Sequence, residues 1–457
     1  MTISLIDSYI FRNSYGTKEM REVFNDRARI QAWLDVEASL ARAQAKLNII
    51  PKDAAKEINT KAKAENIEIE KMKTIYEKTG HPIVPLVNLL KEACIKNYGE
   101  YVHWGATTQD IMDTGNILQV KKAIKVMKKQ LEELKGICLN LSQIHKNTLQ
   151  AGRTHGQQAV PITFGYKVAV WVEEIKRHLV RIKQCQPRLL VLEFSGAAGT
   201  LATIDVDKGF KLQEILSKEL GLNIPPVPWH SSRDNLAEIL SILAMIAATM
   251  AKIANEVIVL QSTEIAEVEQ GQEGRIGSST MPHKRNPMQF EHVVVLSKFV
   301  RANANIMIEA MIGEHERDWS SWGAEMKIVE ESFILTGALL QILNSELSKI
   351  KINKEKMKSN LALLKGLIMS ERVMMQLAKS VGRQTAHTII HDDAMEAFEL
   401  KKEFGEILKT DSRIKDFLSE EEIDSLMDPA TYIGLAPRYV DRVCGNIKKE
   451  EEKEGNL

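Results

Sequence analysis

The most constraining feature of this sequence is a set of long stretches that lack helix-breaking residues. Residues 232–269 contain neither glycine nor proline and carry an almost continuous series of apolar side chains. Residues 114–148 contain no proline and only two glycines. At 1.5 Å per residue, the second stretch predicts a helix of roughly 50 Å. Because ordinary helices average about three turns, we expect an all-α fold with a bundle of long helices.

Other segments fit the same plan. Further helices are predicted at 27–47, 161–186, from 286 onward and 322–350. Shorter helices flank the long ones, which predicts three domains: an N-terminal helical domain at 1–112, a central long-helix bundle at 113–365 and a C-terminal helical domain at 366–457. A helix that is apolar nearly all round must be buried on several sides. The helices of one subunit would hardly cover such apolar surfaces, so we expect several subunits to pack their bundles together.

Composition narrows the class of protein. The 457 residues include 61 Lys+Arg and 61 Asp+Glu, so no net basic field points to a nucleic acid. Four cysteines without CxxC spacing predict a reducing cytoplasm. The N-terminus lacks a signal-peptide pattern. The longest candidate membrane span, 239–254, is short and interrupted by Lys252, so no membrane segment is expected.

A polar loop between two long predicted helices carries the strongest chemical signal. It runs from Gly277 to Pro287 and reads GSSTMPHKRNP. A serine such as Ser278 can act as a nucleophile, or as a base if its alkoxide is stabilised. Lys284 and Asn286 can hold a carboxylate and stabilise charge that develops on it. For Ser279 we expect only a structural hydroxyl.

Five histidines lie in polar loops rather than on helix faces: His81, His103, His155, His230 and His315. A single such histidine more often has a structural role. Together with the Ser278 loop, they predict a site. No two of these five have the three- or four-residue spacing of metal ligands, so we do not expect a metal. We also expect no cofactor. Arg233 and Arg317 share these loops and are candidate substrate-binding residues.

Three motifs resemble the fumarase/aspartase superfamily, in order along nearly the whole chain: 105–110, 152–158 and 277–287. The resemblance implies an all-α, three-domain (L-aspartase-like) subunit and a homotetramer with a central bundle of twenty long helices. Each active site would be built from three subunits. The implied chemistry is anti elimination from a succinyl group, in which a base removes a proton beside a carboxylate and the resulting dianion expels the leaving group.

The resemblance also assigns roles to residues. Ser278 is the base and His155 the general acid. Lys284 and Asn286 bind the carboxylate that takes up the charge. Supporting residues complete the predicted site: Thr107, Thr108 and Thr154 donate hydrogen bonds to the carboxylates, His103 and His81 orient these groups, and Glu291 matches a carboxylate that supports a family histidine.

The branch within the superfamily is less tightly specified. Stretches such as 228–238 and 428–434 resemble 3-carboxymuconate cycloisomerases, whereas Gly80-His81-Pro82 and 315–318 resemble adenylosuccinate lyase. The latter implies C–N cleavage with release of fumarate, with Tyr15 in the nucleotide site. Yet Ser14 and Met326 stand where that family has phosphate-binding arginines, and Gln158 replaces a common histidine. Lactonisation, or cleavage of another N- or O-substituted succinate, therefore stays an alternative.

Two other classes are disfavoured. A metal-dependent enzyme lacks the ligand spacing. A non-enzymatic structural protein, such as the lens proteins of this superfamily, is disfavoured because Ser278, Lys284, Asn286 and His155 are all present. Loss of activity should leave at least one of them changed.

Overall fold

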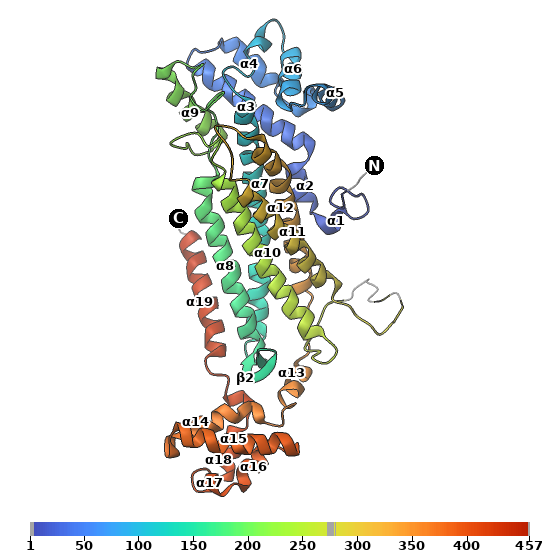
Figure 1. Ribbon diagram of the computed structural model, residues 1–457, viewed down its shortest axis with the longest axis vertical. Helices are drawn as coiled ribbons and strands as arrows, with labels where there is room; N and C mark the ends of the chain where they lie inside the picture. The colour runs from blue at the N-terminus through green and yellow to red at the C-terminus, as the bar shows by residue number, and fades with distance from the viewer. Residues whose placement is uncertain (1–3, 272–277, 279, 456–457) are drawn as a thin grey trace. The chain divides into compact units, whose positions relative to one another are not determined.

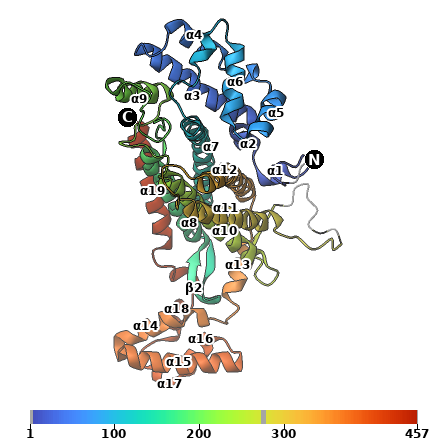
Figure 2. The same cartoon turned by 45° about the horizontal axis from the view of Figure 1, so that its top comes forward.

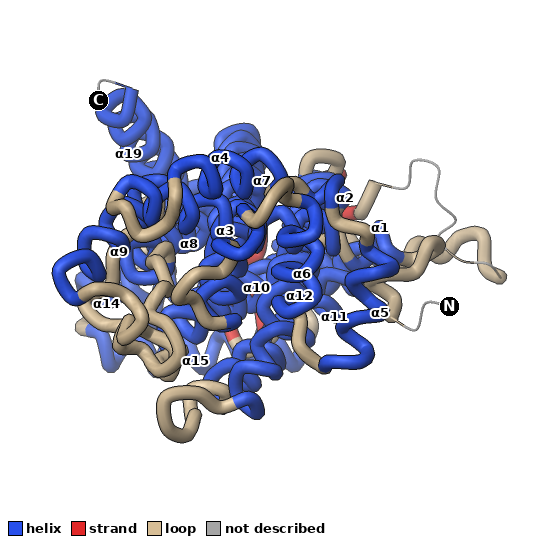
Figure 3. Tube along the Cα trace, turned by 90° about the horizontal axis from the view of Figure 1, so that it is seen from above, coloured by secondary structure: helices blue, strands red, loops and turns tan. Residues whose placement is uncertain are grey.

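The structure is a computed structural model that describes residues 4–271, 278 and 280–455. Helices make up most of the described chain, and the short named strands form two two-stranded sheets (Figure 3). The predicted all-α class is therefore confirmed.

The five longest helices are α7 (Thr108–Ile144), α8 (Phe164–Leu189), α10 (Asp234–Gln261), α11 (Met288–Glu309) and α12 (Trp319–Leu347). Each corresponds to a predicted long helix, with ends that differ by several residues. The largest differences are at α10, which stops well before residue 269, and at α7, which begins at Thr108 rather than at residue 114.

Shorter helices precede and separate the long ones: α1 (Arg12–Tyr15), α2 (Lys18–Phe24), α3 (Asp26–Lys46), α4 (Lys52–Lys61), α5 (Ile69–Thr79), α6 (Ile83–Ala93) and α9 (Val206–Leu220). The C-terminal series is α13 (Lys354–Leu361), α14 (Ser370–Val381), α15 (Arg383–Leu400), α16 (Phe404–Thr410), α17 (Ser412–Lys415), α18 (Glu420–Leu426) and α19 (Ala436–Gly455). Short 3-10 helices occur at Ala64–Asn66, Tyr98–Tyr101, Leu367–Met369 and Pro429–Thr431.

The chain forms two compact units, each assembled from three stretches. Unit 1 contains residues 1–131, 178–251 and 292–341; unit 2 contains 132–177, 252–291 and 342–457. The three-domain division drawn from the sequence stays a prediction beside this grouping.

In unit 1, α3, α4, α5 and α6 lie together (Figure 1). Their apolar faces form a core with the first turn of α7 that includes Trp33, Leu34, Ile58, Leu86 and Ile111. The core buries the face of α3 on which apolar residues recur at helical spacing, because that face would otherwise meet water. Three polar residues, Glu37, Ser39 and Gln44, are buried on this helix as well, and Glu37 is 2 % exposed.

In unit 2, α14, α15, α16 and α17 form a separate group (Figure 2). Their core includes Val373, Leu377, Ile390, Phe404 and Leu408, all buried. Two small sheets also belong to this unit. One pairs β1 (Leu149–Thr154) with β2 (Gln157–Thr163), and the other pairs β3 (Val268–Glu269) with β4 (Lys351–Ile352), both antiparallel. The β1–β2 hairpin replaces the predicted loop and the start of the predicted helix at 161.

Among the described helices, α10 alone has the length and composition of a membrane span. Of its most apolar window, 67 % is buried inside the protein. A mostly buried apolar helix is what the core of a helix bundle requires.

In unit 2, the start of α8 lies very close to the backbone at the end of α7, which gives a stability test. A Cβ on Gly165, at the start of α8, would lie 2.4 Å from the backbone oxygen of Ser142 and 2.7 Å from that of His145. Backbone atoms cannot move aside easily, so Gly165→Ala should lower the free energy of unfolding by about 1–3 kcal/mol. Thermal unfolding of the wild type and of Gly165→Ala measures this loss of stability.

Gly136→Ala is the matched control. Gly136 lies inside α7, and an added Cβ there would meet nothing within 4 Å. Alanine is the better helix former by about 0.5–1 kcal/mol, so this variant should unfold at the same temperature or higher. Equal melting temperatures for the two variants would contradict the packing described for Gly165.

Candidate active site

In unit 1, a buried carboxylate holds the Thr107–Thr108 turn at the start of α7. Asp110 is fully buried, and its Oδ2 accepts hydrogen bonds from the backbone N–H groups of Thr107 at 2.9 Å and Gly196 at 3.0 Å. Its Oδ1 accepts a further hydrogen bond from the N–H of Ser195 at 2.9 Å. A carboxylate in the first helical turn also interacts favourably with the helix dipole. Asp110 therefore fixes the turn that carries both threonines.

His81 lies against this turn. Its ring nitrogens are 3.3 and 3.4 Å from Oγ1 of Thr108, and the ring is exposed. The structure thus brings together two residues separated by 27 positions that the sequence assigned to one site. Tyr15 is placed beside α11, where its ring meets the edge of His292 at 5.1 Å between centroids. His292 Nε2 donates to the backbone oxygen of Ser14 at 2.9 Å.

His103 is paired with a buried glutamate on α3. Its Nδ1 lies 2.6 Å from Oε1 of Glu37, and its backbone N–H donates to Oε2 at 3.1 Å. Burial alone would lower the pKa of His103, but the Glu37 carboxylate outweighs that effect, so the pKa is raised above its ordinary value. The backbone of His103 is left-handed, with φ of 60°, a conformation uncommon outside glycine.

The two candidate arginines of unit 1 differ in exposure. Arg317 is exposed and donates to Oε1 of Gln109 at 2.7 Å and to the backbone oxygen of Ala197 at 3.0 Å. Arg233 is only 4 % exposed. Its guanidinium donates to Asp113 at 2.7 Å and to Glu325 at 2.8 Å. Arg233 is therefore committed to two buried carboxylates rather than open to a ligand.

One group among the described residues has the composition of a metal site: Asp110, Glu193 and His230. His230 Nε2 lies 2.9 Å from Asp110 Oδ1 and 3.4 Å from Glu193 Oε1. Burial raises the pKa of Glu193 to about 7 against the opposing effect of His230. Each carboxylate already accepts hydrogen bonds from backbone or hydroxyl donors. Burial lowers the pKa of His230, but Asp110 and Glu193 outweigh it, so that pKa is raised.

In unit 2, His155 lies at the tip of the β1–β2 hairpin. Thr154 pairs with Gln157, which leaves His155 and Gly156 as a two-residue turn with φ of 50° and 77°. Positive φ at both central residues is what a type I′ hairpin turn requires. The side chains of Thr154 and His155 are exposed. The hairpin therefore presents both predicted site residues outward at its tip.

A second buried carboxylate anchors this hairpin. Glu267 is fully buried and accepts hydrogen bonds from Arg153 at 2.6 Å, Gln150 at 2.6 Å and Asn360 at 2.8 Å. Gln158, on β2, donates to the backbone oxygen of Asn360 at 2.9 Å. Both strands of the hairpin are thus tied to neighbouring segments of unit 2.

The Ser278 loop also lies in unit 2. The Ser278 hydroxyl oxygen accepts from the backbone N–H groups of Thr280 at 3.3 Å and Met281 at 3.0 Å. Lys284 is exposed, Asn286 is half-buried, and Glu291 is exposed on the first turn of α11. Gly277 and Ser279 lie outside the described residues.

Two family models match the chain. The first, described as "Lyase", covers residues 12–301. The chain belongs to the fumarase/aspartase superfamily of lyases. The second, described as "Adenylosuccinate lyase C-terminus", matches residues 366–443. The membership predicted from the three motifs is therefore confirmed, and the chain is a superfamily lyase.

Relatives in this superfamily act on different compounds. The chain is 42 % identical to adenylosuccinate lyase of Methanocaldococcus jannaschii over 96 % of this chain and 95 % of the relative. It is 38 % identical to N-acetyl-S-(2-succino)cysteine lyase of Dickeya dadantii over 97 % of each. It matches the structure of 3-carboxy-cis,cis-muconate lactonizing enzyme from Pseudomonas putida with a TM-score of 0.90, 32 % identity and coverage of 97 % and 99 %. Similarity alone therefore does not select one substrate.

Sequence reasoning assigned no role to the residues that hold these turns, namely Glu37, Asp110, Glu193 and Glu267. A signal was present for two of them. Glu37 interrupts the apolar face of α3, and Glu267 follows the apolar run of α10. A carboxylate in such a position is buried only if it is paired.

The Glu37–His103 pair gives a pH test. A raised folded-state pKa means that protonated His103 stabilises the fold below its ordinary pKa of about 6.5, and that this contribution is lost as the pH rises through the raised value. Glu37→Gln should therefore lower the pKa of His103, read by NMR titration. It should also reduce the melting temperature more at about pH 5.5 than at about pH 8.5.

Glu77→Gln is the control, since Glu77 makes only an exposed ion pair with Lys73 at 4.0 Å. That variant should leave the His103 titration unchanged. An unchanged His103 pKa in Glu37→Gln would contradict the assigned pairing.

Proposed function

We propose that this protein releases fumarate from a 2-substituted succinate by anti elimination. Ser278 is the base, His155 donates a proton to the leaving group, and Lys284 and Asn286 bind the carboxylate that takes up negative charge. Thr107, Thr108 and Thr154 donate hydrogen bonds to the carboxylates. Glu291, on the helix that follows the Ser278 loop, supports a histidine.

The observation that carries this proposal is the environment of Ser278. Its oxygen accepts two backbone N–H groups, and Lys284 follows in the same loop. Hydrogen bonds to the charged form of a group favour that form. An alkoxide at Ser278 is thus the base that this loop supports best, and exposed His155 in its hairpin turn suits proton transfer to a bound ligand.

The remaining residues of unit 1 take supporting roles in this proposal. His81 and His103 orient the threonine turn and its ligand, and Arg317 and Tyr15 are assigned to substrate binding. For Arg233 we favour positioning over substrate binding, because Asp113 and Glu325 already occupy its guanidinium.

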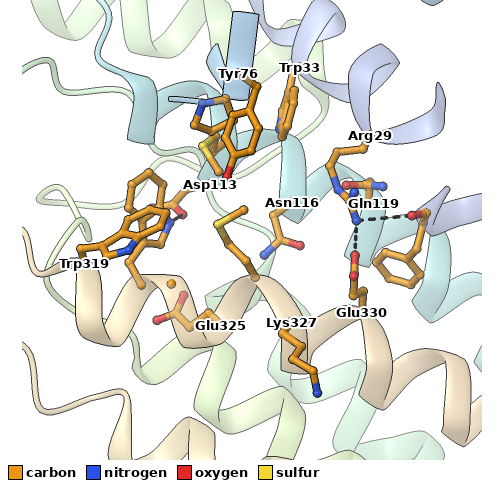
Figure 4. Close-up of a pocket in the computed structure, with 16 residues that line it drawn as sticks. Arg29, Trp33, Tyr76, Asp113, Asn116, Gln119, Trp319, Glu325, Lys327 and Glu330 are labelled. Atoms are coloured by element: carbon orange, nitrogen blue, oxygen red, sulfur yellow. Dashed lines mark hydrogen bonds and ion pairs between the residues drawn. The ribbon is translucent and has the colours of Figure 1, made fainter. Parts of the chain in front are cut away.

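A pocket of about 390 Å³ in unit 1 bears on the leaving group (Figure 4). Pro82, which follows His81, lines it, and so do Met112, Asp113 and Asn116, which lie one to two turns beyond Thr108 on α7. The pocket therefore lies beside the His81–Thr108 pair. Its other lining residues include five aromatic side chains: Phe24, Trp33, Tyr76, Trp319 and Trp322.

The charges of this pocket disfavour a phosphate. Its two lining cations are Arg29 and Lys327. Arg29 is paired with Glu330, and Lys327 with Glu331 at 2.9 Å. A phosphate dianion needs charge-assisted donors, and Met326 contributes none. We therefore favour a leaving group without a phosphate, such as the thiol that the name N-acetyl-S-(2-succino)cysteine lyase implies for a relative. Adenylosuccinate is the second candidate, supported by the 42 % identity to a lyase of that name.

We further propose a cytoplasmic homotetramer in which three subunits contribute to each site. Apolar side chains stay exposed on the long helices of this single chain: Val170, Val180, Met245, Val259, Val295, Phe299, Ile306 and Ile308. Exposed apolar side chains in such number on the long helices are expected where a surface packs against other subunits.

A substrate panel tests the function. Purified protein is given N-acetyl-S-(2-succino)cysteine, adenylosuccinate, argininosuccinate or 3-carboxymuconate, and products are identified by NMR. We expect fumarate from the first compound and a turnover reduced about 10²–10⁴-fold in Ser278→Ala. Ser348→Ala, at an exposed serine after α12, is the matched control and should retain wild-type turnover.

The outcomes distinguish the possible leaving groups, reactions and bases. Fumarate from adenylosuccinate alone would overturn the preference for an unphosphorylated leaving group. Lactone from carboxymuconate without fumarate would replace elimination by cycloisomerisation. Wild-type turnover in Ser278→Ala would remove Ser278 as the base.

A further inference from the structure

A buried polar group in unit 1 lies behind the threonine turn and has no part in the proposed chemistry. It consists of Asp110, Glu193, Ser195 and His230, each no more than 6 % exposed. Ser195 Oγ donates to Glu193 Oε1 at 2.6 Å, and Glu193 Oε2 accepts from the backbone N–H of Trp229 at 2.5 Å. His230 Nε2 donates to Asp110 Oδ1 at 2.9 Å.

The group includes a serine, a histidine and an aspartate, yet it cannot act as a hydrolytic triad. Ser195 Oγ is 3.4 Å from His230 Nδ1, which is long for a nucleophile and its base, and its proton is directed to Glu193. All members are buried, so no substrate reaches the hydroxyl. Chemistry at Ser195 is therefore excluded by access as well as by geometry.

We propose that His230 is a positioning residue for substrate binding: through Asp110 it fixes the Thr107–Thr108 turn in the orientation that binds a succinyl carboxylate. This inference rests on the proposed function, which assigns both threonines to the substrate.

The contacts follow one path. His230 donates to Oδ1 of Asp110, whose Oδ2 accepts the backbone N–H of Thr107. A second contact reinforces the first, because the backbone oxygen of His230 accepts from Gln109 Nε2 at 2.9 Å. Gln109 and Asp110 are the two residues that directly follow Thr108. His230 therefore contacts both of them, one with its side chain and one with its backbone.

Removing the imidazole leaves Asp110 without its only side-chain donor among the described residues. A buried carboxylate that loses a donor reorients or draws in water. Either change shifts the N–H of Thr107 and, with it, the hydroxyl of Thr108. The hydrogen bonds of this path involve neither Lys284 nor Asn286, to which we assign the carboxylate that takes up charge. Ground-state binding should therefore weaken more than the chemical step.

The test compares kcat and KM for His230→Leu and His230→Gln, using the panel compound that the wild type cleaves. His230→Leu should raise KM about tenfold and leave kcat within about twofold, the pattern of lost uniform binding. His230→Gln retains an N–H donor and should restore most of the affinity. His178→Gln is the control, since His178 is a buried histidine of the same unit, bonded to Thr249 at 2.9 Å.

A double-mutant cycle with Thr108→Val identifies the path. If His230 acts through the turn, His230→Leu should change KM far less in the Thr108→Val background than in the wild type. An equal effect in both backgrounds would overturn the proposal, and so would an equal loss of kcat and kcat/KM. Should His230→Leu fail to fold, His230→Asn takes its place, because its shorter amide does not reach Asp110.

Calorimetry with succinate separates this inference from the proposed function. Succinate keeps both carboxylates and needs no turnover, so its affinity should fall about tenfold in His230→Leu even if every panel compound is inert. Inert panel compounds with this loss of affinity would contradict the proposed reaction alone. Unchanged succinate affinity would overturn the role of His230 alone.

Discussion

Two buried carboxylates carry the local order on which the candidate site depends. In unit 1, Asp110 joins the Thr107–Thr108 turn, the 195–196 backbone and His230. In unit 2, Glu267 joins the β1–β2 hairpin to α13. A buried charge is costly unless every lone pair is used, so each carboxylate tolerates only one arrangement of its donors. The exposed groups that we assign to substrate binding gain their fixed positions from these buried anchors.

Three loop histidines also have a backbone conformation that the surrounding structure must hold in place. His103, His155 and His315 all have positive φ, and all lie in loops. Such conformations cost free energy and persist where the surrounding structure imposes them. For His103 the constraint is Glu37, which binds both its ring and its N–H. For His155 it is the tight turn between β1 and β2, whose strands Arg153 and Gln158 attach to the rest of unit 2.

Local patterns predicted the long helices, because runs without glycine or proline have few other structures available. They also predicted the Ser278 loop, because its eleven residues form a specific motif. The hairpin that carries His155 was missed, since glutamines, a glycine and Pro161 are poor strand formers. The partners of Asp110 and Glu267 were missed for another reason. They lie 85 and 114 positions away, and helical periodicity carries no information on such pairings.

The most direct measurement is complementation between two inactive chains. Ser278→Ala and His155→Ala are co-expressed with different tags, and assemblies that contain both tags are isolated. If the base and the acid of one site come from different subunits, some mixed sites hold both wild-type groups, and fumarate release should rise well above that of either variant alone. Mixed assemblies as inactive as their parents would contradict the proposed site built from several chains around Ser278 and His155.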